Sequence, residues 1–397
     1  MQSERARALH LLQRIERERL YASLLLIGES GFVRTLVLGV LRWRSRLDFV
    51  IAELARRPVK KLDPPVVDAL RVGLYQLLFM DVAQYAAVSE TVDLAPKRAR
   101  GFVNAILRNV TRGQVPEPRD PATRHAHPQW LFERWARTYG AERAEKIAAA
   151  NQELSYPDVL VLGDISPEGE RSTLVPDVWK LHGGSAELDR AEFHPMDEGS
   201  AVIAAITRAC GDDVLDLAAA PGGKSLYMEH HGARVVANDV SIARLRVSRG
   251  GRLVVSDGRR PPFRRKFDVV LLDAPCSATG TIRKNPELKW RLREEELQGF
   301  AKLQRELLES ARTMANRWVV YSTCSLEREE NDAIVGDHDD ITPFVPEGVK
   351  QWVEDGVLRL TPESGADGFT AFVLDVGRAS ARQNGARDEA RATLHAT

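Results

Sequence analysis

The fold is most constrained by a series of apolar runs in the second half of the chain, which alternate with helical stretches from about residue 197. The runs are DVLDLA (213–218), ARVVANDV (233–240), RLVVSD (252–257), FDVVLLDAP (267–275) and RWVVYSTC (317–324). Continuous apolar strands separated by helices are typical of a parallel sheet that is covered on both faces. We therefore expect an α/β, Rossmann-like domain over residues 197–379.

Residues 1–112 instead predict an all-α domain, because their apolar residues recur with the spacing of one helix face. The stripes are Val33, Leu36, Val37, Val40 and Leu41; Leu47, Val50, Ile51 and Leu54; Val66, Leu70, Leu74, Leu77 and Leu78; and Phe102, Val103, Ile106, Leu107 and Val110. The third stripe follows KLDPP, which is a helix start signal. We expect arginines such as Arg42, Arg44 and Arg46 to cover the opposite faces.

A stretch rich in proline and turn-forming residues, TRGQVPEPRDPATRHAHP (111–128), separates these two parts and predicts a linker. Its two histidines, His125 and His127, have no cysteine or carboxylate cluster nearby, so we expect structural or solvated side chains and no metal site. Residues 129–150 return to a helical pattern, and 151–195 are irregular with strand-like runs such as PDVLVLGDI.

We therefore expect four parts along the chain. They are a helical domain with its linker (1–127), a small α+β connecting subdomain (128–196), the α/β domain (197–379) and a disordered tail (380–397), which lacks apolar periodicity.

The composition excludes several classes of protein. Hydrophobic content of 44% with 28% charged residues is ordinary for a globular protein, and no apolar run approaches the roughly 20 residues that cross a bilayer. The charged N-terminus lacks the apolar block of a secretion signal, and three cysteines without regular spacing make no disulfide framework. We expect a cytoplasmic monomer that does not bind a membrane.

The charge is unevenly distributed although the net charge is zero. Residues 1–127 hold 21 Lys/Arg against 13 Asp/Glu, and the rest of the chain carries the compensating negative charge. A basic module of this kind indicates a phosphate-bearing partner such as RNA, but a solvated helical surface explains the same surplus. Charge alone leaves both readings open.

One glycine turn and three acids indicate a nucleotide-like ligand. In VLDLAAAPGGKSLYM a strand leads through small residues to a helix start, where free N–H groups and close backbone approach favour such a ligand. The loop matches neither the phosphate-binding pattern nor G-x-G-x-x-G. Asp239, Asp257 and Asp273 end three successive strands, where an acid can accept hydrogen bonds from ribose hydroxyls or an exocyclic amine. Together these features outline an adenosine site.

Two of the three cysteines, Cys276 and Cys324, also lie at the carboxyl ends of strands, where open α/β sheets place their ligands. Cys210, in the helical ITRAC, is expected to be a small buried hydrophobe. Strand-end cysteines beside an adenosine site indicate covalent chemistry on an electron-poor ring. A thiolate that adds to C6 of a pyrimidine makes C5 nucleophilic toward the methyl group of a sulfonium, and Asp273 is an acid that could act near N3.

Three motifs resemble those of a known family. DLAAAPGGKS, LLDAPCSATGTIRKNPELKW and YSTCSLEREEN are similar to motifs of the NOL1/NOP2/Sun family of RNA 5-methylcytosine methyltransferases, and the middle motif, with Arg283, Pro286 and Trp290, is very specific. Upstream, GVLRWRSRLDFVIAEL, RVGLYQLLFMDV and GFVNAILRNV resemble the NusB-like RNA-binding domain of the bacterial Sun/Fmu type. MDEGSAVIA and ESGADGF resemble flanking motifs, so the resemblance covers roughly residues 5–375.

The resemblance implies a class I methyltransferase domain that uses S-adenosyl-L-methionine. It implies that Cys324 is the nucleophile and that Cys276 resolves the adduct, whereas spacing alone leaves both orders open and DNA cytosine methyltransferases use the Pro-Cys cysteine as nucleophile. The implied cofactor-binding residues are Ala218, Ala219, Ala220, Pro221, Gly222, Gly223, Lys224, Asp239, Asp257 and Asp273. No metal is implied.

The sequence departs from the family pattern in three places. Ala218 replaces a usual cysteine, Ala278 replaces a usual glycine, and only 17 residues separate Asp239 from Asp257, so the intervening helix should be trimmed to a short piece around SIARLRVSR. We expect methylation of C5 of a cytosine in small-subunit (16S) ribosomal RNA, on a base that is unpaired or flipped out. The alternatives are the same chemistry on transfer RNA and a non-catalytic RNA-binding assembly factor.

Overall fold

The computed structural model describes residues 3–155, 157–182 and 192–377, so the expected tail at 380–397 lies outside the described residues. The chain divides into two compact units. Unit 1 comprises Met1–Leu154 and Ile282–Glu294, and unit 2 comprises Ser155–Thr281 and Glu295–Thr397. The expected boundaries at residues 127 and 196 stay a prediction; the second segment of unit 1, from within the middle motif, was not expected.

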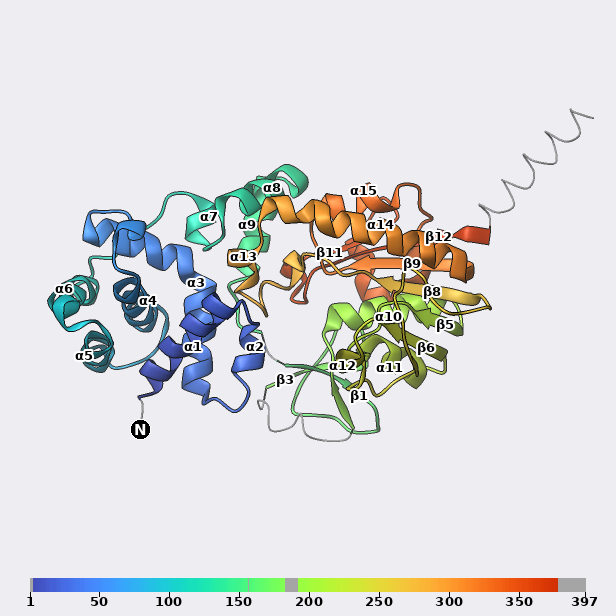
Figure 1. Cartoon of the computed structure of the whole chain (residues 1–397), viewed down its shortest axis with the longest axis horizontal. Coiled ribbons are helices and arrows are strands. Elements are labelled where there is room, and N and C mark those ends of the chain that lie inside the picture. The colour runs from blue at the N-terminus through green and yellow to red at the C-terminus, as the bar shows by residue number, and fades with distance from the viewer. Residues whose placement is uncertain (1–2, 156, 183–191, 378–397) are drawn as a thin grey trace, which may run out of the picture. The chain divides into compact units, whose positions relative to one another are not determined.

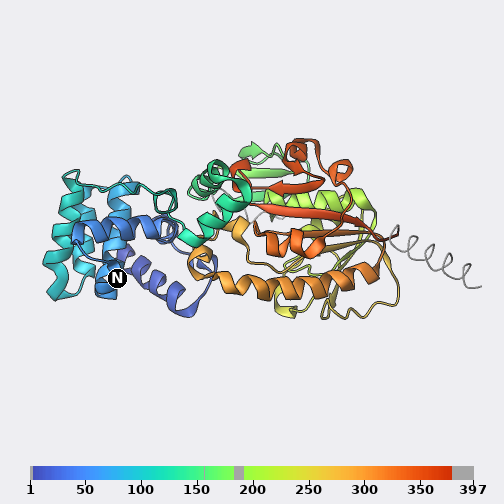
Figure 2. The same cartoon turned by 90° about the horizontal axis from the view of Figure 1, so that it is seen from above.

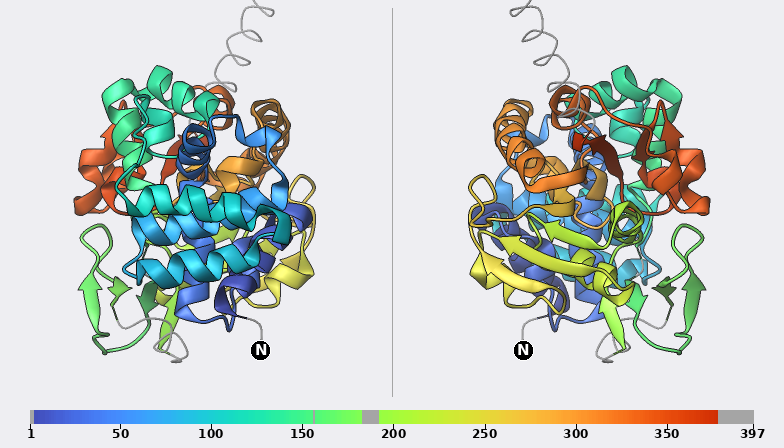
Figure 3. Two further views of the ribbon diagram at one scale, coloured as in Figure 1. Left: turned by 90° about the vertical axis from the view of Figure 1, so that its left-hand side faces the viewer. Right: turned by 90° about the vertical axis from the view of Figure 1, so that its right-hand side faces the viewer.

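Unit 1 is helical, as the apolar stripes predict (Figure 1). Its longer helices are α1 (Glu4–Glu18), α3 (Gly31–Ala55), α4 (Pro64–Phe79), α5 (Gln84–Leu94), α6 (Arg100–Thr111), α8 (Gln129–Tyr139) and α9 (Ala141–Ala150). One-turn helices are α2 (Ala22–Leu25), α7 (Pro121–Arg124) and α13 (Leu288–Arg291). Helices α4, α5 and α6, blue to cyan in the left panel of Figure 3, pack against one another.

Local signals fix where these helices begin. The hydroxyl of Ser30 accepts a hydrogen bond from Val33 N and caps α3, and α4 starts at Pro64, within the predicted start signal KLDPP. The first two apolar stripes lie on one continuous helix, α3, because nothing between them interrupts it. The core of unit 1 is built from these stripes, in which Leu36, Val50 and Leu70 have no exposed surface.

The expectation that Arg42 faces solvent is wrong. The Arg42 side chain is buried and its guanidinium donates a hydrogen bond of 2.9 Å to the carbonyl of Arg283, while Lys289 Nζ donates one of 2.9 Å to the carbonyl of Arg42. Ile282–Glu294 thus packs on α3 within unit 1 through buried polar contacts, which helix periodicity cannot reveal.

Unit 2 contains two sheets and the helices that cover them. A small antiparallel sheet has the strand order β2-β3-β1-β4, with β1 (Asp158–Val161), β2 (Gly169–Arg171), β3 (Val178–Leu181) and β4 (Phe193–Pro195). The larger sheet has eight strands in the order β10-β11-β12-β9-β8-β5-β6-β7. Its parallel part is β5 (Asp213–Asp216), β6 (Arg234–Asp239), β7 (Arg252–Val255), β8 (Phe267–Asp273) and β9 (Ala315–Thr323).

These five parallel strands confirm the α/β prediction. Alternate residues of β8 enter cores on opposite faces: Val269 packs with α10 (Glu198–Cys210) and α11 (Gly223–His230), and Val270 packs with α14 (Leu297–Met314). The edge strand β7 is not covered in this way, since Leu253 and Val255 are exposed. Figure 2 shows α14, in orange, running along one side of the sheet. The antiparallel strands β10 (Val353–Glu354), β11 (Val357–Leu360) and β12 (Phe369–Asp375) extend the sheet and were not predicted.

The order of the strands creates a switch point. From β5 the chain proceeds outward to β6 and β7 on one side, and it then returns to β8 and β9 on the other. The carboxyl ends of β5 and β8 therefore diverge into different loops, which is where open α/β sheets bind ligands. Within the part of the chain that the structure describes, no helix has the length and apolar character of a membrane span.

A test of the packing in unit 1 uses two glycines of the same helix. A Cβ at Gly39 would collide with the ring of Tyr75 on α4, whereas a Cβ at Gly31 would meet no atom within 4 Å. Gly39→Ala should lower the free energy of unfolding by about 1–3 kcal/mol because it overpacks the α3–α4 contact. Gly31→Ala should leave it unchanged or raise it by up to about 1 kcal/mol. Chemical denaturation measures both, and equal effects would contradict this packing.

Candidate active site

A pocket of about 190 Å³ lies at the switch point of unit 2, with Asp216 at the end of β5 and Asp273 at the end of β8 in its wall. The remaining lining comes from the glycine turn and from residues just before and within α10: His194, Pro195, Met196, Asp197, Ser200, Ala218, Ala219, Ala220, Pro221, Gly223 and Lys224. The pocket thus contains most of the residues that the glycine turn predicted.

The glycine turn has a backbone that only glycine adopts easily. Gly222 has φ +102°, and a Cβ there would collide with Ser248, while Gly223 begins α11. The amide of Ala220 donates a 3.0 Å hydrogen bond to Asp239 Oδ2, which holds the turn against the end of β6. Small side chains and a fixed backbone leave room for a ligand at the start of α11.

The carboxylates of Asp239 and Asp257 differ in burial and in their hydrogen-bond partners. Asp239 is buried and accepts hydrogen bonds from the amides of Ala220 and Ser241, the second at 2.8 Å. Asp257 is paired with Arg259 at 2.7 Å, whose hydrogen bonds lower the pKa of Asp257 to about 2. Neither carboxylate lines the 190 Å³ pocket. The intervening helix is the single turn α12 (Ile242–Leu245), as the short spacing predicts.

Asp216 was missed by sequence reasoning because it looks like part of an ordinary strand, DVLDLA. It is buried, and burial raises its pKa to about 7. Its Oδ2 accepts a 2.7 Å hydrogen bond from Ser225 Oγ, but its Oδ1 has no hydrogen-bond partner and belongs to a residue of the pocket wall. A buried oxygen without a partner is suited to a ligand donor, because leaving it unpaired costs free energy.

An ion pair joins the glycine turn to β8. Lys224 Nζ lies 2.6 Å from Asp273 Oδ2, and Asp273 Oδ1 accepts a 2.8 Å hydrogen bond from Ser322 Oγ on β9. Burial lowers the pKa of Lys224, but the charge and hydrogen bond of Asp273 more than offset this, so that its pKa is raised overall. Lys224 is therefore a cation in the pocket wall.

The structure brings the two strand-end cysteines together. Cys276 Sγ and Cys324 Sγ are 3.3 Å apart as free thiols, on the loops that follow β8 and β9. The hydrogen bond with Cys324, burial and the charges of Glu330 and Asp273 raise the pKa of Cys276 well above its ordinary value. Cys276 is therefore held as a thiol. Burial raises the pKa of Cys210 to about 12, in keeping with its expected structural role.

Cys324 has a different electrostatic environment. It is among the groups whose charge helps to raise the pKa of Lys224, so the Lys224 ammonium group lies within its electrostatic reach. The S–H of Cys276 can donate a hydrogen bond to Cys324 Sγ. The pair is thus asymmetric, with one sulfur kept protonated and the other placed near a cation.

A buried carboxylate that sequence reasoning missed, Glu330, holds the two cysteine loops. Its Oε1 accepts from the amide of Ser277 at 2.8 Å and from Gln304 Nε2 at 3.0 Å. Its Oε2 accepts from Ser325 Oγ at 2.5 Å and from Ser277 Oγ. Since Ser277 follows Cys276 and Ser325 follows Cys324, one side chain fixes both loops. Nothing in LEREEN distinguishes this glutamate from its neighbours.

One of the departures from the family pattern, Ala278, lies in the loop after Cys276. Ala278, where the family usually has glycine, has φ +58°, in the left-handed region. The next residues are held to the Cys324 loop, since Gly280 N donates 2.9 Å to the carbonyl of Cys324. The loop therefore keeps a glycine-like conformation without the glycine.

The described residues hold no cluster of three or more histidine, cysteine or acidic side chains suited to a metal ion. His127 is buried, with Nδ1 2.7 Å from the carbonyl of His125 and Nε2 3.3 Å from Asn151 Nδ2. Both ring nitrogens of His127 therefore contact polar groups of the protein itself.

The glycine turn and the strand-end acids form a pocket at the switch point of an α/β sheet, where such folds bind their ligands, and comparisons with known proteins identify the class. Residues 204–369 match the family described as 16S rRNA methyltransferase RsmB/F, and residues 2–112 match the NusB family. The chain is 30% identical to the probable ribosomal RNA small subunit methyltransferase B of Bacillus subtilis, covering 91% of this chain and 96% of that protein.

Further relatives agree. The ribosomal RNA small subunit methyltransferase B of Sodalis glossinidius is 32% identical, covering 79% of this chain and 82% of that protein. The crystal structure of PH0851 has a TM-score of 0.67 at 25% identity and covers 91% of this chain and 94% of that one. NSun6 from Pyrococcus horikoshii, at 20% identity, shares the fold with a TM-score of 0.55 over 64% of this chain and 99% of that one.

The chain belongs to the ribosomal RNA small subunit methyltransferase B family. It is a ribosomal RNA methyltransferase with a NusB-like all-α domain and a Rossmann-like methyltransferase domain, and its cofactor is S-adenosyl-L-methionine. The glycine turn and the unpartnered Asp216 oxygen fit that group, because both favour a ligand that brings hydrogen-bond donors close to the backbone. The alternative of a non-catalytic assembly factor is set aside.

The buried carboxylate can be tested against an exposed one. Glu330→Ala should lower the free energy of unfolding by on the order of 2–4 kcal/mol, because it leaves several buried donors of Ser277, Ser325 and Gln304 without an acceptor. Glu309→Ala, which removes a side chain 73% exposed, should change it by less than about 0.5 kcal/mol. Thermal and chemical denaturation measure both, and a Glu330→Ala protein as stable as the control would contradict the network.

Proposed function

We propose that this methyltransferase modifies C5 of a cytosine in small-subunit ribosomal RNA through a covalent bond between Cys324 and C6. The observation that carries the proposal is the thiol pair, 3.3 Å apart, beside the Lys224–Asp273 ion pair. A structural role for the cysteines would not need two thiols at the ligand-binding edge of the sheet. A carbon–carbon methylation at C5 needs such a nucleophile, because C5 of cytosine is not reactive by itself.

The cofactor would be held by the glycine turn and the strand-end acids. We assign Ala218, Ala219, Ala220, Pro221, Gly222, Gly223 and Lys224 to its backbone cradle, with Asp239, Asp257 and Asp273 at the strand ends. Asp216 joins them because its free oxygen belongs to a residue of the pocket wall. When bound, S-adenosyl-L-methionine supplies an electrophilic methyl group to C5.

The residues of the chain would act in order. The Cys324 thiolate forms a bond to C6, and the ring electrons move to N3, which takes a proton from the Lys224–Asp273 pair. After C5 has received the methyl group, the proton on C5 leaves to water. N3 returns the proton that it took to the Lys224–Asp273 pair. The bond from C6 to Cys324 Sγ then breaks and the thiolate departs. The base must be out of a stack for this attack.

Cys276 would act at the release step. Its raised pKa keeps it protonated, so its S–H can donate a hydrogen bond to the departing Cys324 thiolate 3.3 Å away. Without that donor the thiolate is a poorer leaving group. This assignment of the two roles agrees with the different surroundings of the two cysteines. It is the opposite of the assignment in DNA cytosine methyltransferases, where the Pro-Cys cysteine is the nucleophile.

The family names concern small-subunit ribosomal RNA, so a transfer RNA substrate has no support from the relatives reported above. The basic surplus of residues 1–127 supports binding of the RNA backbone. A cytoplasmic location and a monomeric state stay predictions.

Substitutions separate the two cysteines. Cys324→Ser should abolish methyl transfer and leave no covalent protein–RNA species, because a hydroxyl is a much weaker nucleophile than a thiolate. Cys276→Ala removes the S–H donor, so it should allow attack but slow release, and a denaturation-resistant RNA adduct should accumulate on a gel. The double variant should lose that adduct.

Cys210→Ser serves as the matched control, since Cys210 lies on α10 away from the thiol pair, and it should keep activity without an adduct. An adduct that accumulates with Cys324→Ser, and not with Cys276→Ala, would invert the roles. Full methylation by Cys324→Ser would remove the covalent mechanism altogether.

A further inference from the structure

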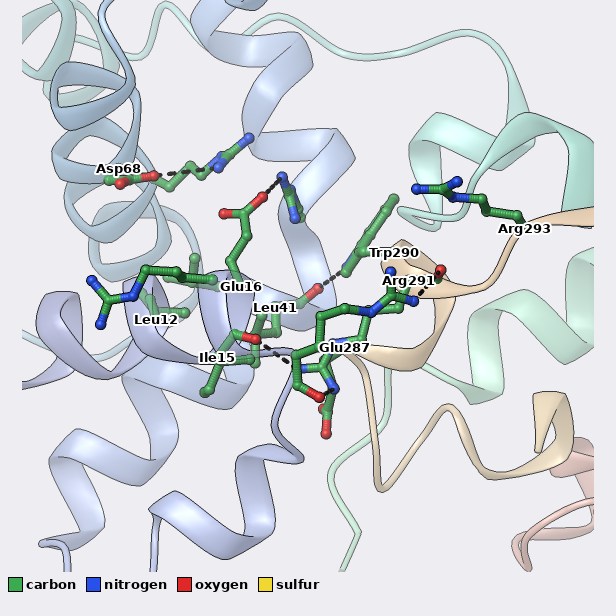
Figure 4. Close-up of a pocket in the computed structure, with 14 residues that line it drawn as sticks. Leu12, Ile15, Glu16, Leu41, Asp68, Glu287, Trp290, Arg291 and Arg293 are labelled. Carbon is green, nitrogen blue, oxygen red and sulfur yellow. Dashed lines mark hydrogen bonds and ion pairs between the residues drawn. The ribbon is translucent and has the colours of Figure 1, made fainter. Parts of the chain in front are cut away.

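Unit 1 contains a pocket that the methylation chemistry does not use. It has a volume of about 310 Å³, at the lower end of the range for small-molecule sites. Its walls come from α1, α3 and α4 and from residues 287–293 of the family-specific middle motif (Figure 4). This places the motif's Trp290, which the sequence singled out without a role, in the wall of a cavity of the NusB-like domain.

The motif segment is held in place by its own polar groups. Trp290 Nε1 donates a 2.6 Å hydrogen bond to the carbonyl of Leu41, and Arg291 donates to the carbonyls of Ile15 and Arg19, each at 2.9 Å, and of Leu20. Figure 4 marks the contact of Trp290 with Leu41 and that of Arg291 with Ile15 by dashed lines. The pocket wall is therefore preformed.

The pocket is lined by more cations than anions. Six arginines line it, against three acids, and three of the arginines are engaged in ion pairs: Arg17 with Glu18 at 3.0 Å, Arg44 with Glu16 at 2.8 Å, and Arg71 with Asp48 at 2.7 Å and Asp68 at 3.5 Å. The hydrogen bonds of Arg291 go to neutral carbonyls, so its charge is not neutralised by them. Burial lowers the pKa of Arg291, as expected for a cation with too little compensation. An anionic group would complete this wall.

The third acid of the pocket offers an acceptor. Glu287 is 1% exposed, and its Oε1 accepts a 2.9 Å hydrogen bond from the amide of Ala22. Its Oε2 is buried and has no hydrogen-bond partner. Such an oxygen is suited to a ligand donor, for example a ribose hydroxyl or the amine of a base.

An aromatic wall accompanies these charges. Trp290 lines the cavity, and the Arg44 guanidinium lies over its ring at 5.9 Å. Aromatic rings and guanidinium planes are the surfaces on which unstacked bases of single-stranded RNA lie. Cations, an aromatic plane and one buried acceptor together match a phosphate, a base and a hydrogen-bond donor.

We propose that this pocket binds one nucleotide of the single-stranded segment of ribosomal RNA that carries the target base. The phosphate lies against Arg44 and Arg291, the base against Trp290, and a hydroxyl or amine donates to Glu287. The proposal rests on the ribosomal RNA substrate of the proposed function. It gives residues 287–291, which belong to a methyltransferase motif, a role in holding RNA at the NusB-like domain.

The test measures binding of a fluorescent small-subunit ribosomal RNA fragment to the full chain as a function of salt. Arg44→Gln should weaken binding about tenfold and reduce the slope of log K against log salt by about one, since one phosphate contact is lost. Glu287→Gln keeps an oxygen that can accept from Ala22 N but replaces the second carboxylate oxygen by an amide NH2 group. It should weaken RNA binding by the same factor at all salt concentrations. Trp290→Phe should weaken it less than Trp290→Leu.

Arg98→Gln is the matched control, because Arg98 is a 79% exposed arginine of the same unit and does not line the pocket. It should change RNA affinity by less than about twofold. Binding of S-adenosyl-L-methionine, measured by calorimetry, and the melting temperature should match wild type in Arg44→Gln and Arg98→Gln. These readouts separate loss of the pocket from loss of the fold.

Equal RNA affinity of Arg44→Gln and Arg98→Gln in folded, cofactor-binding protein would overturn the proposal. So would tight binding of cytidine or guanosine monophosphate in the absence of RNA, which would make this a site for a free nucleotide. Failure of the proposed function would give a different result. A wild-type chain that binds the RNA in this salt-dependent way but forms no adduct through Cys324 would support the proposed pocket and contradict the covalent chemistry.

Discussion

The carboxylate of Glu330 accepts hydrogen bonds from both loops that carry the cysteines, in a part of unit 2 where its side chain has no exposed surface. Because Ser277 and Ser325 each follow a cysteine directly, this one acceptor helps to fix the positions of both sulfurs. A hydrogen bond to a charged acceptor is stronger than one between neutral groups, so the loops are held more firmly than backbone contacts alone would hold them.

This arrangement gives Cys276 and Cys324 different electrostatic surroundings. Cys276 is half-buried, and its hydrogen bond with Cys324, together with the charges of Glu330 and Asp273, opposes its ionisation and raises its pKa. Cys324 lies within the influence of the Lys224 cation, which is itself maintained by Asp273. In the proposed mechanism, these two thiols 3.3 Å apart serve different steps, one as a nucleophile and the other as a donor to the leaving group. The parallel sheet contributes by bringing the ends of β8 and β9 together.

Much of the fold was predictable because it depends on periodicity. The strands β5, β6, β8 and β9 place apolar residues in the cores, and the helical stripes of residues 33–110 bury one face, so simple spacing finds both. The cysteines and the glycine turn were predictable because strand ends gather at one edge of a sheet. The small helix α12 followed from the short spacing between Asp239 and Asp257.

The remainder depends on contacts that local sequence does not encode. Glu330 sits in a charged segment and Asp216 in an ordinary strand, yet both are buried at the site. Arg42 was expected in solvent but bonds to the carbonyl of Arg283, a residue 241 positions away. The same long-range packing assigns Ile282–Glu294 to unit 1, which no spacing rule for a methyltransferase motif would indicate.

The central claim, a carbon-5 methylation that needs the Cys324 sulfur, is tested most directly on the product. Small-subunit ribosomal RNA would be isolated from cells that make either the wild-type chain or Cys324→Ser, in place of any other copy of the enzyme, and its nucleosides would be mapped by mass spectrometry. We expect one cytosine to carry a C5 methyl group with the wild-type chain and to lack it with the variant. A methyl group on another atom, or one that persists in Cys324→Ser, would contradict the account.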